Sequence, residues 1–421
     1  MAGHVQDRWY KTETDANGKE TRVKSDRYGT GMRYRARYIG PDGTEKSKSF
    51  RDGQKRLAEK WLSKTETDMN SGQYIDPKLA QTTFREYAER WLKAQTSDPT
   101  SRESVNSQVR LHALPYLGSR PLGSFKPEHI REWLSDLERA VPATSYRRVI
   151  FSSVSAILNA AVDDEYMRKN PCAASTVHAP ARSAQKVVPW TAERVFTVQS
   201  ALPEQYRAMV DLGAGCGLRQ GEVFGLAEDA IRFQTGWVHV GCQVKVVEGA
   251  LVFDLPKRQK ERDVPLSPQV AEALKKHMAD FAPVSVTLPW ARPDGKPVTK
   301  RLLFIRLSGN GAVRRNDFNT RLWKPALVAA DVIPAAEPGK PHTAAREHGM
   351  HALRHFYASV LLDAGENIKA LSTYLGHTDP GFTLRTYTHL LPSSDGRART
   401  AMDKVYLGRP FRPDGPQTAQ G

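Results

Sequence analysis

The sequence has few cysteines and no long apolar segment. Only three of its 421 residues are cysteine, namely Cys172, Cys216 and Cys242, and none forms a CxxC pair. This usage is typical of reduced, buried thiols in a cytoplasmic protein and not of a disulfide framework. The apolar runs are far shorter than the ~20 residues of a membrane-spanning helix, and residues 1–15 lack the apolar core of a secretory signal. We therefore expect no membrane association and a cytoplasmic location.

Acidic residues are too few to balance the basic ones. The chain carries 62 Lys and Arg against 46 Asp and Glu, which gives a net charge of +16 and a pI near 9.7. An excess of this size on a globular chain is typical of a protein with a polyanionic partner, most commonly nucleic acid. Charge alone leaves open a basic enzyme that binds no nucleic acid.

Length and composition predict a folded protein of several domains. With 39% hydrophobic and 26% charged residues, the composition is that of an ordinary globular chain. At ~150 residues per domain, there is room for about three domains. We predict a multidomain, mainly α-helical protein with small β-sheets.

A small sheet-plus-helix module is predicted over residues 27–77, after a polar extension at 1–26. Residues 32–39 alternate with period two, which predicts a strand. A turn and a second strand follow at 44–50, and a helix starts at about Asp52. The first strand places three arginines on one face, namely Arg33, Arg35 and Arg37. This face is either solvated or, given the net charge, a DNA-binding surface.

Three further parts are distinguished by the spacing of their apolar residues. Residues 81–174 contain four segments of helical periodicity and form an all-α domain, which a polar and basic linker at 175–186 follows. Residues 187–395 mix helices with strand-like alternation at 238–246 and a short basic hairpin at 256–266, which predicts an α+β domain. In 396–421, a helix carrying Ala398, Met402, Val405 and Tyr406 on one stripe precedes a disordered tail.

Histidines are concentrated near the end of the chain, where six of the twelve fall between His342 and His389. His351 and His355 lie one helical turn apart, which is a spacing that zinc ligands use. The zinc-protease pattern needs Glu directly after the first histidine, however, and Ala352 stands there. Arg354, between the two histidines, would also repel a dication. We therefore predict no metal site.

Several short motifs surround these histidines. Arg219 lies at a glycine-flanked helix start in Gly215–Glu222, a place that suits a phosphate group. Leu375-Gly376-His377 ends one helix, and Asp379-Pro380 starts the next. That last helix carries Tyr387. Each fragment alone also fits an ordinary hydrophobic core.

Five motifs, in their order along the chain, resemble those of the tyrosine recombinases, the phage-integrase family. They are GLRxGE, VPL after a basic hairpin, HxLRH, LGH and TYxH. The resemblance extends from about Arg27 to about Leu391. It implies that 27–77 is an arm-DNA-binding module, 81–174 a SAM-like core-binding domain, and 187–395 the tyrosine-recombinase catalytic domain. On this interpretation the arginine face, Arg33, Arg35 and Arg37, contacts arm-site DNA.

The resemblance also implies roles for seven residues of the catalytic domain. The matching positions are the catalytic arginines Arg219 and Arg354, the HxxR-box histidine His351, the later histidine His377, the hairpin lysine Lys257, the supporting acid Glu222 and the nucleophile Tyr387. Lys260 is the alternative to Lys257, which precedes Pro265 by eight residues. Tyr374 is the alternative nucleophile, but its place between Leu371 and Leu375 predicts packing. The segment from His377 to Tyr387 is one residue longer than is common in the family, and the turn at 379–381 can absorb the extra residue.

The implied activity is site-specific DNA recombination through a 3′-phosphotyrosyl intermediate and a Holliday junction, which integrates or excises a mobile element. Two arginines would neutralise the charge of the reacting phosphate, and His351 would accept the tyrosine proton. Lys257 would protonate the leaving 5′-oxygen, and His377 would hydrogen-bond the phosphate. No metal, ATP or other cofactor is implied.

The implied partners are double-stranded attachment-site DNA, further copies of the chain in a tetramer on DNA, and a host bending factor or an excisionase. The location would be the bacterial cytoplasm, at the nucleoid during activity.

Two other interpretations stay open. A type IB topoisomerase-like relaxing enzyme would not need the arm-binding module, and a catalytically inactive DNA-binding protein would not need all seven site positions filled. The sequence also leaves open whether the terminal helix packs on its own domain or on a neighbouring copy.

Overall fold

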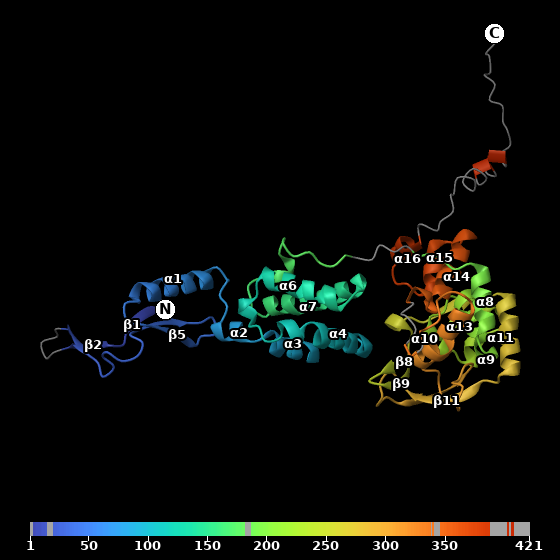
Figure 1. The fold of residues 1–421 in the computed structure, drawn as a ribbon, viewed down its shortest axis with the longest axis horizontal. Coiled ribbons are helices and arrows are strands. Elements are labelled where there is room, and N and C mark those ends of the chain that lie inside the picture. The colour runs from blue at the N-terminus through green and yellow to red at the C-terminus, as the bar shows by residue number, and fades with distance from the viewer. Residues whose placement is uncertain are drawn as a thin grey trace, which may run out of the picture. The chain divides into compact units, whose positions relative to one another are not determined.

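A computed structural model describes residues 3–14, 20–181, 187–337, 339–340, 346–387, 402–403 and 406–407 (Figure 1). Helices predominate and the sheets are small and antiparallel, which confirms the predicted fold class. The chain divides into two compact units, Met1–Ser183 and Ala184–Gly421. Among the described residues, no helix has both the length and the apolar character needed to cross a membrane. Most of the predicted terminal helix, including Ala398 and Val405, lies outside the described residues.

The first unit begins with a three-stranded antiparallel sheet in the order β1-β4-β5. Strand β4 (Tyr34–Ile39) pairs with β5 (Glu45–Phe50), as the alternation predicted. Tyr34, Ala36 and Tyr38 are buried beneath helix α1 (Lys55–Asn70). The Tyr38 and Trp61 rings pack edge to face, with centroids 5.6 Å apart. One face of the strand therefore forms a small core, and the arginines lie on the other.

Three strands occupy the segment for which the sequence analysis predicted only a polar extension. Strand β1 (His4–Asp7) pairs with β4, and β2 (Tyr10–Thr14) forms a hairpin with β3 (Glu20–Lys24). These strands bury few side chains, so they lack the apolar alternation that reveals a strand in a sequence. Their stability comes from pairing with partners that the local sequence does not specify.

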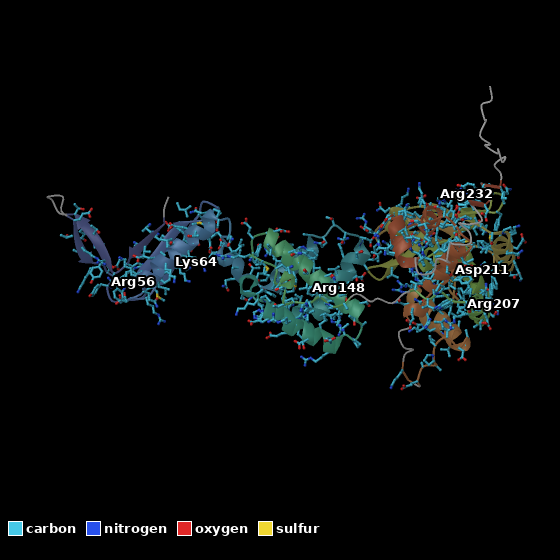
Figure 2. The ribbon with its side chains drawn as sticks, turned by 90° about the horizontal axis from the view of Figure 1, so that it is seen from above. Arg56, Lys64, Arg148, Arg207, Asp211 and Arg232 are labelled. Atoms are coloured by element: carbon cyan, nitrogen blue, oxygen red, sulfur yellow. The ribbon has the colours of Figure 1, made fainter. Side chains whose placement is uncertain are left out.

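A helical bundle follows, with one buried cluster around Trp133. Its helices are α2 (Pro77–Gln81), α3 (Phe84–Lys93), α4 (Pro99–His112), α5 (Leu114–Leu117), α6 (Pro127–Ala140) and α7 (Thr144–Asp163), with short 3₁₀ turns at Leu122–Ser124 and Pro171–Ala173. Thr83 and Glu86 form a capping box at the start of α3. The Trp133 indole donates a hydrogen bond of 2.7 Å to the His112 carbonyl. Arg148 of α7, labelled in Figure 2, donates to the Pro180 carbonyl at 2.9 Å and so anchors the segment after the bundle.

The second unit surrounds a larger core with helices and short strands. Its helices are α8 (Ala192–Ala201), α9 (Glu204–Gly215), α10 (Gln220–Phe224), α11 (Pro268–Asp280), α12 (Arg315–Phe318), α13 (Lys324–Ala329), α14 (His351–Asp363), α15 (Ile368–Leu375) and α16 (Pro380–Tyr387). Its strands are β6 (Ile231–Arg232), β7 (Trp237–Val240), β8 (Gln243–Val247), β9 (Ala250–Asp254), β10 (Arg262–Pro265), β11 (Val284–Pro289) and β12 (Pro297–Leu302). Shorter helical turns lie at Glu228–Ala230, Lys257–Gln259, Asn319–Trp323 and Arg346–His348.

The predicted hairpin at 256–266 is wrong. Strand β9 pairs with β8, whereas β10 pairs with β7 in a different sheet. The alternating residues at 238–246 belong to two strands, β7 and β8, and not to one. Gly241 and Cys242 separate these strands. Residues 256–261 are therefore a connection between two sheets, and the turn at Lys257–Gln259 places Arg258 and Gln259 at positive φ angles of 66° and 55°.

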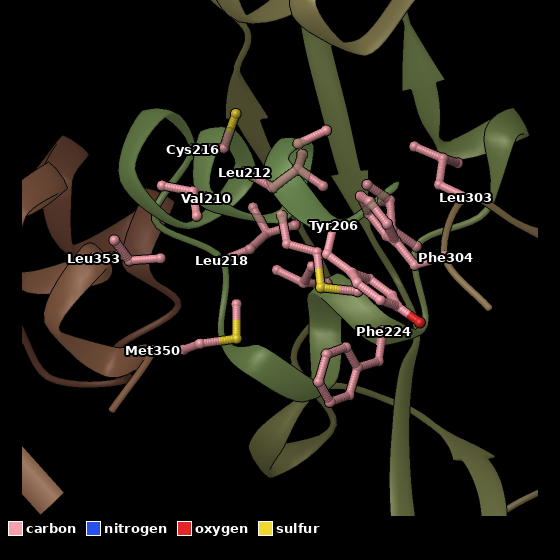
Figure 3. Close-up of a cluster of buried hydrophobic side chains, with 14 of the residues drawn as sticks. Tyr206, Val210, Leu212, Cys216, Leu218, Phe224, Leu303, Phe304, Met350 and Leu353 are labelled. Carbon is pink, nitrogen blue, oxygen red and sulfur yellow. The ribbon is translucent and has the colours of Figure 1, made fainter. Parts of the chain in front are cut away.

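Close packing of α9 against α14 fixes the geometry near the predicted site. Met350 and Leu353 point towards Val210 and Leu218 (Figure 3). A Cβ atom at Gly213 would lie 2.8 Å from the Leu353 side chain, so the two helices approach at a glycine. Gly217, at φ +65°, then turns the chain beneath the Tyr357 ring, which a Cβ atom would meet at 2.5 Å. These two glycines place Arg219 beside α14.

Candidate active site

The turn after α9 presents Arg219 at the start of α10. Its backbone N–H donates to Glu222 Oε2 at 2.8 Å, and its Nη1 donates to Glu222 Oε1 at 2.9 Å. Glu222 thus already accepts the backbone N–H of Arg219, and α10 has only five residues. The side chain of Arg219 remains 22% exposed, so its guanidinium is available to an anion.

Glu222 is completely buried between two arginines. Arg262 donates from Nη1 to Oε1 at 3.0 Å and from Nη2 to Oε2 at 2.7 Å. Burial would raise the pKa of Glu222, but the hydrogen bonds and charge of Arg262, together with Arg219 and Arg354, lower it to about 2. Glu222 therefore stays ionised and holds both guanidinium groups in place.

Arg262 is not among the residues predicted from the sequence. This side chain is 1% exposed, and its Nε also donates to the Tyr374 carbonyl at 2.6 Å. A buried carboxylate beside one partly exposed arginine needs a second cation, which is the signal that could have revealed it. Tyr374 is half-buried and packs against the core, in agreement with the predicted packing role.

Arg354, on α14, is fully buried. Its Nη1 donates to the Gly217 carbonyl at 2.7 Å, and its Nη2 donates to the Leu375 carbonyl and to His377 Nε2, the latter at 3.1 Å. Burial and the neighbouring arginines lower the pKa of Arg354 to about 9, which still leaves it charged at neutral pH. Arg219 Nη2 donates to the same Leu375 carbonyl at 3.2 Å. The two predicted catalytic arginines therefore converge on one oxygen atom.

His377 follows α15, which Gly376 ends at φ +62°. Because a guanidinium can only donate, His377 Nε2 accepts from Arg354, and Nδ1 then donates to Thr383 Oγ1 at 2.7 Å. Desolvation and the charges of Arg354, Arg219, Arg262 and Arg258 lower the pKa of His377 to about 3. The ring is therefore neutral at pH 7, and Thr383 fixes its orientation.

Tyr387 ends α16 and is 2% exposed. Its hydroxyl lies 2.8 Å from Nδ1 of His355, one turn along α14 from His351. Burial raises the pKa of Tyr387 to about 12, although the charges of Arg354 and Arg219 oppose this shift. The His351 and His355 rings pack edge to face at 4.6 Å. Desolvation, and then the charges around it, also lowers the pKa of His351 below its ordinary value. From the sequence, His355 was distinguished only by its zinc-like spacing from His351.

Lys257 is the predicted residue that the structure does not bring into contact with this group. It is exposed, and within the described part of the chain its side chain makes no hydrogen bond or ion pair. Its neighbour Arg258 instead contacts the Thr378 hydroxyl, next to His377. Lys260, the alternative, is half-buried.

The predicted DNA-binding arginines lie in the first unit and are partly neutralised. Arg33 pairs with Asp7 at 3.0 Å and with Asp52 at 2.9 Å, and Arg37 pairs with Glu45 at 2.6 Å. Arg35 donates to the Ser47 hydroxyl at 2.8 Å. Of the three, Arg35 has no carboxylate partner in the described residues.

A tyrosine hydroxyl beside a neutral imidazole and two converging guanidiniums is a site suited to attack on a phosphodiester. Comparison with known families supports this class. Residues 191–394 match the phage integrase family, and residues 83–137 match the phage integrase N-terminal SAM-like domain. The chain therefore belongs to the phage integrase family and is a tyrosine-type site-specific recombinase.

Individual relatives agree with this assignment. A protein of Mycobacterium tuberculosis described as a prophage phiRv2 integrase is 27% identical over 381 residues, which cover 89% of this chain and 93% of the relative. A tyrosine recombinase XerC-like protein of Caldanaerobacter subterraneus is 25% identical and covers 67% of this chain and 72% of its own length.

Two solved structures share the fold. The Tn1549 transposon integrase in complex with transposon right end DNA has a TM-score of 0.62 at 20% identity, covering 77% of this chain and 100% of that one. A lambda integrase tetramer bound to a Holliday junction has a TM-score of 0.52 at 16% identity, covering 88% of this chain and 96% of that one.

Proposed function

We propose that Tyr387 is the nucleophile with which this recombinase cleaves and rejoins attachment-site DNA, forming a 3′-phosphotyrosyl intermediate and a Holliday junction. The observation that carries the proposal is the convergence of Arg219 and Arg354 on the Leu375 carbonyl oxygen. The charges of the same two arginines also act to lower the pKa of the Tyr387 hydroxyl. A non-bridging phosphate oxygen is an acceptor of the same kind. Two fixed cations would stabilise the extra charge that develops there in the transition state.

Glu222 and His377 support this arrangement. Glu222 holds Arg219 in place, and Arg262 keeps Glu222 ionised. Neutral His377 is held by Thr383 and lies against Arg354. To donate to the phosphate it would carry its proton on Nε2, and Nδ1 would then accept from the Thr383 hydroxyl. Preorganised donors of this kind need no rearrangement at the moment of reaction.

Lys257 remains our proposed donor to the leaving 5′-oxygen. Its exposed side chain lies in a turn between two sheets, next to Arg258, which already contacts the segment after His377. A long, flexible ammonium group can reach bound DNA from such a turn. We propose no metal or nucleotide cofactor, because the phosphotyrosyl bond conserves the energy needed for religation.

The proposed division of labour follows the predicted boundaries. Three separate buried clusters, around Tyr38, Trp133 and Tyr206, support an arm-binding module at 27–77, a core-binding domain at 81–174 and a catalytic domain at 187–395. We propose that four copies assemble on two DNA duplexes at the bacterial nucleoid, as the DNA-bound lambda integrase tetramer suggests for this fold. A host bending factor or an excisionase would be a further partner.

The test uses the element's own attachment-site DNA with a nick beside the cleavage point, so that the short fragment diffuses away and the covalent adduct accumulates. The wild-type protein should form the adduct in the presence of EDTA. Tyr387→Phe should bind the DNA and form no adduct, whereas the matched control Tyr374→Phe should still form it. An adduct with Tyr387→Phe, or a strict need for a divalent ion, would contradict the proposal.

A further inference from the structure

Tyr387 cannot attack a phosphate while its hydroxyl keeps its proton. The phenol is buried and its pKa is raised to about 12, so loss of the proton to water is unfavourable at neutral pH. Within the described part of the chain, the one hydrogen-bond partner of this hydroxyl is Nδ1 of His355, at 2.8 Å. The residue that receives the proton should lie within hydrogen-bonding distance of the Tyr387 hydroxyl.

His351 was the acceptor implied by the family resemblance, but the structure gives it a different neighbour. Its ring packs against the His355 ring at 4.6 Å and lies towards Arg354 and Arg219. No hydrogen bond links His351 to Tyr387 among the described residues. The histidine that touches the reacting oxygen is the second one of the motif.

We propose that His355 is a catalytic residue that accepts the proton of Tyr387 when the phenol attacks the DNA phosphate, an inference that rests on the proposed function of Tyr387. In this step the Oη–H bond breaks and the proton moves to Nδ1 of His355. The Oη–P bond forms, the bond from phosphorus to the 5′-oxygen breaks, and that oxygen takes a proton from Lys257. His351 packs against the His355 ring and orients it.

The surroundings keep His355 ready for this role. Desolvation and the charge of Arg354 lower the pKa of His355 to about 4, so the ring is neutral before DNA binds. Nδ1 can accept a proton in the tautomer that carries hydrogen on Nε2. The charged and titratable groups next to His355 are His351 and Arg354 on the same helix and Tyr387 on α16. Arg219 and His377 act on the neighbouring His351. The negative charge of a bound phosphate would offset the arginines and make the imidazole more basic.

The experiment compares full-length His355→Asn and His351→Asn with the wild type in single-turnover cleavage of the nicked attachment-site DNA. An asparagine amide retains a polar atom near the position of Nδ1 but cannot take a proton. We expect His355→Asn to slow cleavage about 100-fold, the scale of general base catalysis, with DNA affinity unchanged. The rate should then increase with pH through the range in which the phenol ionises.

A second substrate separates the two proton transfers. When sulfur replaces the bridging 5′-oxygen, the leaving group needs no proton. This substrate should therefore restore the cleavage rate of Lys257→Ala but not that of His355→Asn. A fluorinated tyrosine at 387 has a phenol that ionises more easily, so it should partly restore the cleavage rate of His355→Asn. It should not increase the slow rate of Lys257→Ala on the oxygen substrate. If His355→Asn does not fold, the same pair of substrates is applied to His355→Gln.

Three results would overturn the inference: cleavage by His355→Asn at or above the wild-type rate, restoration of this variant by the sulfur substrate, or no effect of the fluorinated tyrosine on it. A rate above the wild type would mean that His355 restrains the nucleophile. Failure of the proposed function gives a different result, because the wild-type protein would then form no adduct through Tyr387 on either substrate.

Discussion

Arg262 binds Glu222 with both of its terminal nitrogens, and neither side chain is more than 1% exposed. This pair fixes Arg219, which shares Glu222, and through Tyr374 it also fixes the end of α15. An arginine without a predicted role therefore connects the strand β10 to the two segments that carry Arg219 and His377.

Replacing Arg262 with methionine should destabilise the second unit by about 3–5 kcal/mol, because it leaves Glu222 buried and ionised without its strongest partner. The free energy of unfolding in urea measures this loss. Arg232 is a suitable control, because its pair with Asp263 is exposed and 3.7 Å long. Arg232→Ala should change stability by less than about 1 kcal/mol. Equal effects of the two variants would contradict the role given to Arg262.

Stability should fall as the pH drops below neutral. His355 and His377 have an ordinary pKa of 6.5, lowered in the fold to about 4 and about 3, so only the unfolded chain takes up their protons as the pH falls below 6.5. Glu222 has its pKa lowered from 4.5 to about 2, so its contribution is present above 4.5 and is lost as the pH falls towards 2. As the pH falls, the free energy of unfolding should therefore decrease first through protonation of the histidines and then through protonation of Glu222.

Urea unfolding at a series of pH values from about 7 to about 4 measures this dependence. His355→Asn should flatten the slope below 6.5, because it removes one of the groups that only the unfolded chain protonates in this range. A wild-type free energy of unfolding that is constant over this range would show that the buried histidines do not resist protonation as described.

Thr383→Val should slow DNA cleavage without weakening DNA binding. The hydroxyl of this fully buried threonine accepts from His377 Nδ1 at 2.7 Å, and valine has nearly the same shape but no acceptor. Loss of one orienting hydrogen bond of about 1 kcal/mol predicts a decrease in rate of roughly five- to tenfold. Thr383→Ser should retain the wild-type rate. Thr386→Val should retain it as well, because the half-buried Thr386 hydroxyl donates to the carbonyl of Phe382, within its own helix. A slow Thr386→Val variant would point to a general defect of α16.

Local pattern predicted much of the fold. The alternation of Tyr34, Ala36 and Tyr38 identified β4, because one face of that strand is buried and the other is not. Helix signals were also reliable, as Gly376, which ends α15, and Pro380, which begins α16, show. The motifs around Arg219, Arg354 and Tyr387 predicted which side chains the fold would bring together.

Contacts between distant segments could not be predicted in this way. Strand β10 pairs with β7 and not with β9, the strand that precedes it in the sequence. Packing determines this pairing, and the basic residues at 256–262 do not indicate it. Arg262 looked like one more surface cation, although it is almost completely buried. His355 is distinguished from His351 only by the direction in which each ring points once α16 packs against α14, and no spacing in the sequence records that direction.

Arg35 should contribute most of the arm-site binding among Arg33, Arg35 and Arg37. Arg33 and Arg37 already pair with carboxylates, whereas Arg35 has only the Ser47 hydroxyl and sits in the middle strand of the sheet. Arg35→Ala should weaken binding to arm-site DNA and reduce the dependence of log K on log salt concentration by ~0.9, the value for one phosphate contact. Binding to the core site should not change. Arg33→Ala should instead destabilise the module, because Asp7 and Asp52 each lose an ion-pair partner. If Arg35→Ala weakens both DNA sites equally, or neither, then this face is not a separate arm-binding surface and the arginines are simply solvated.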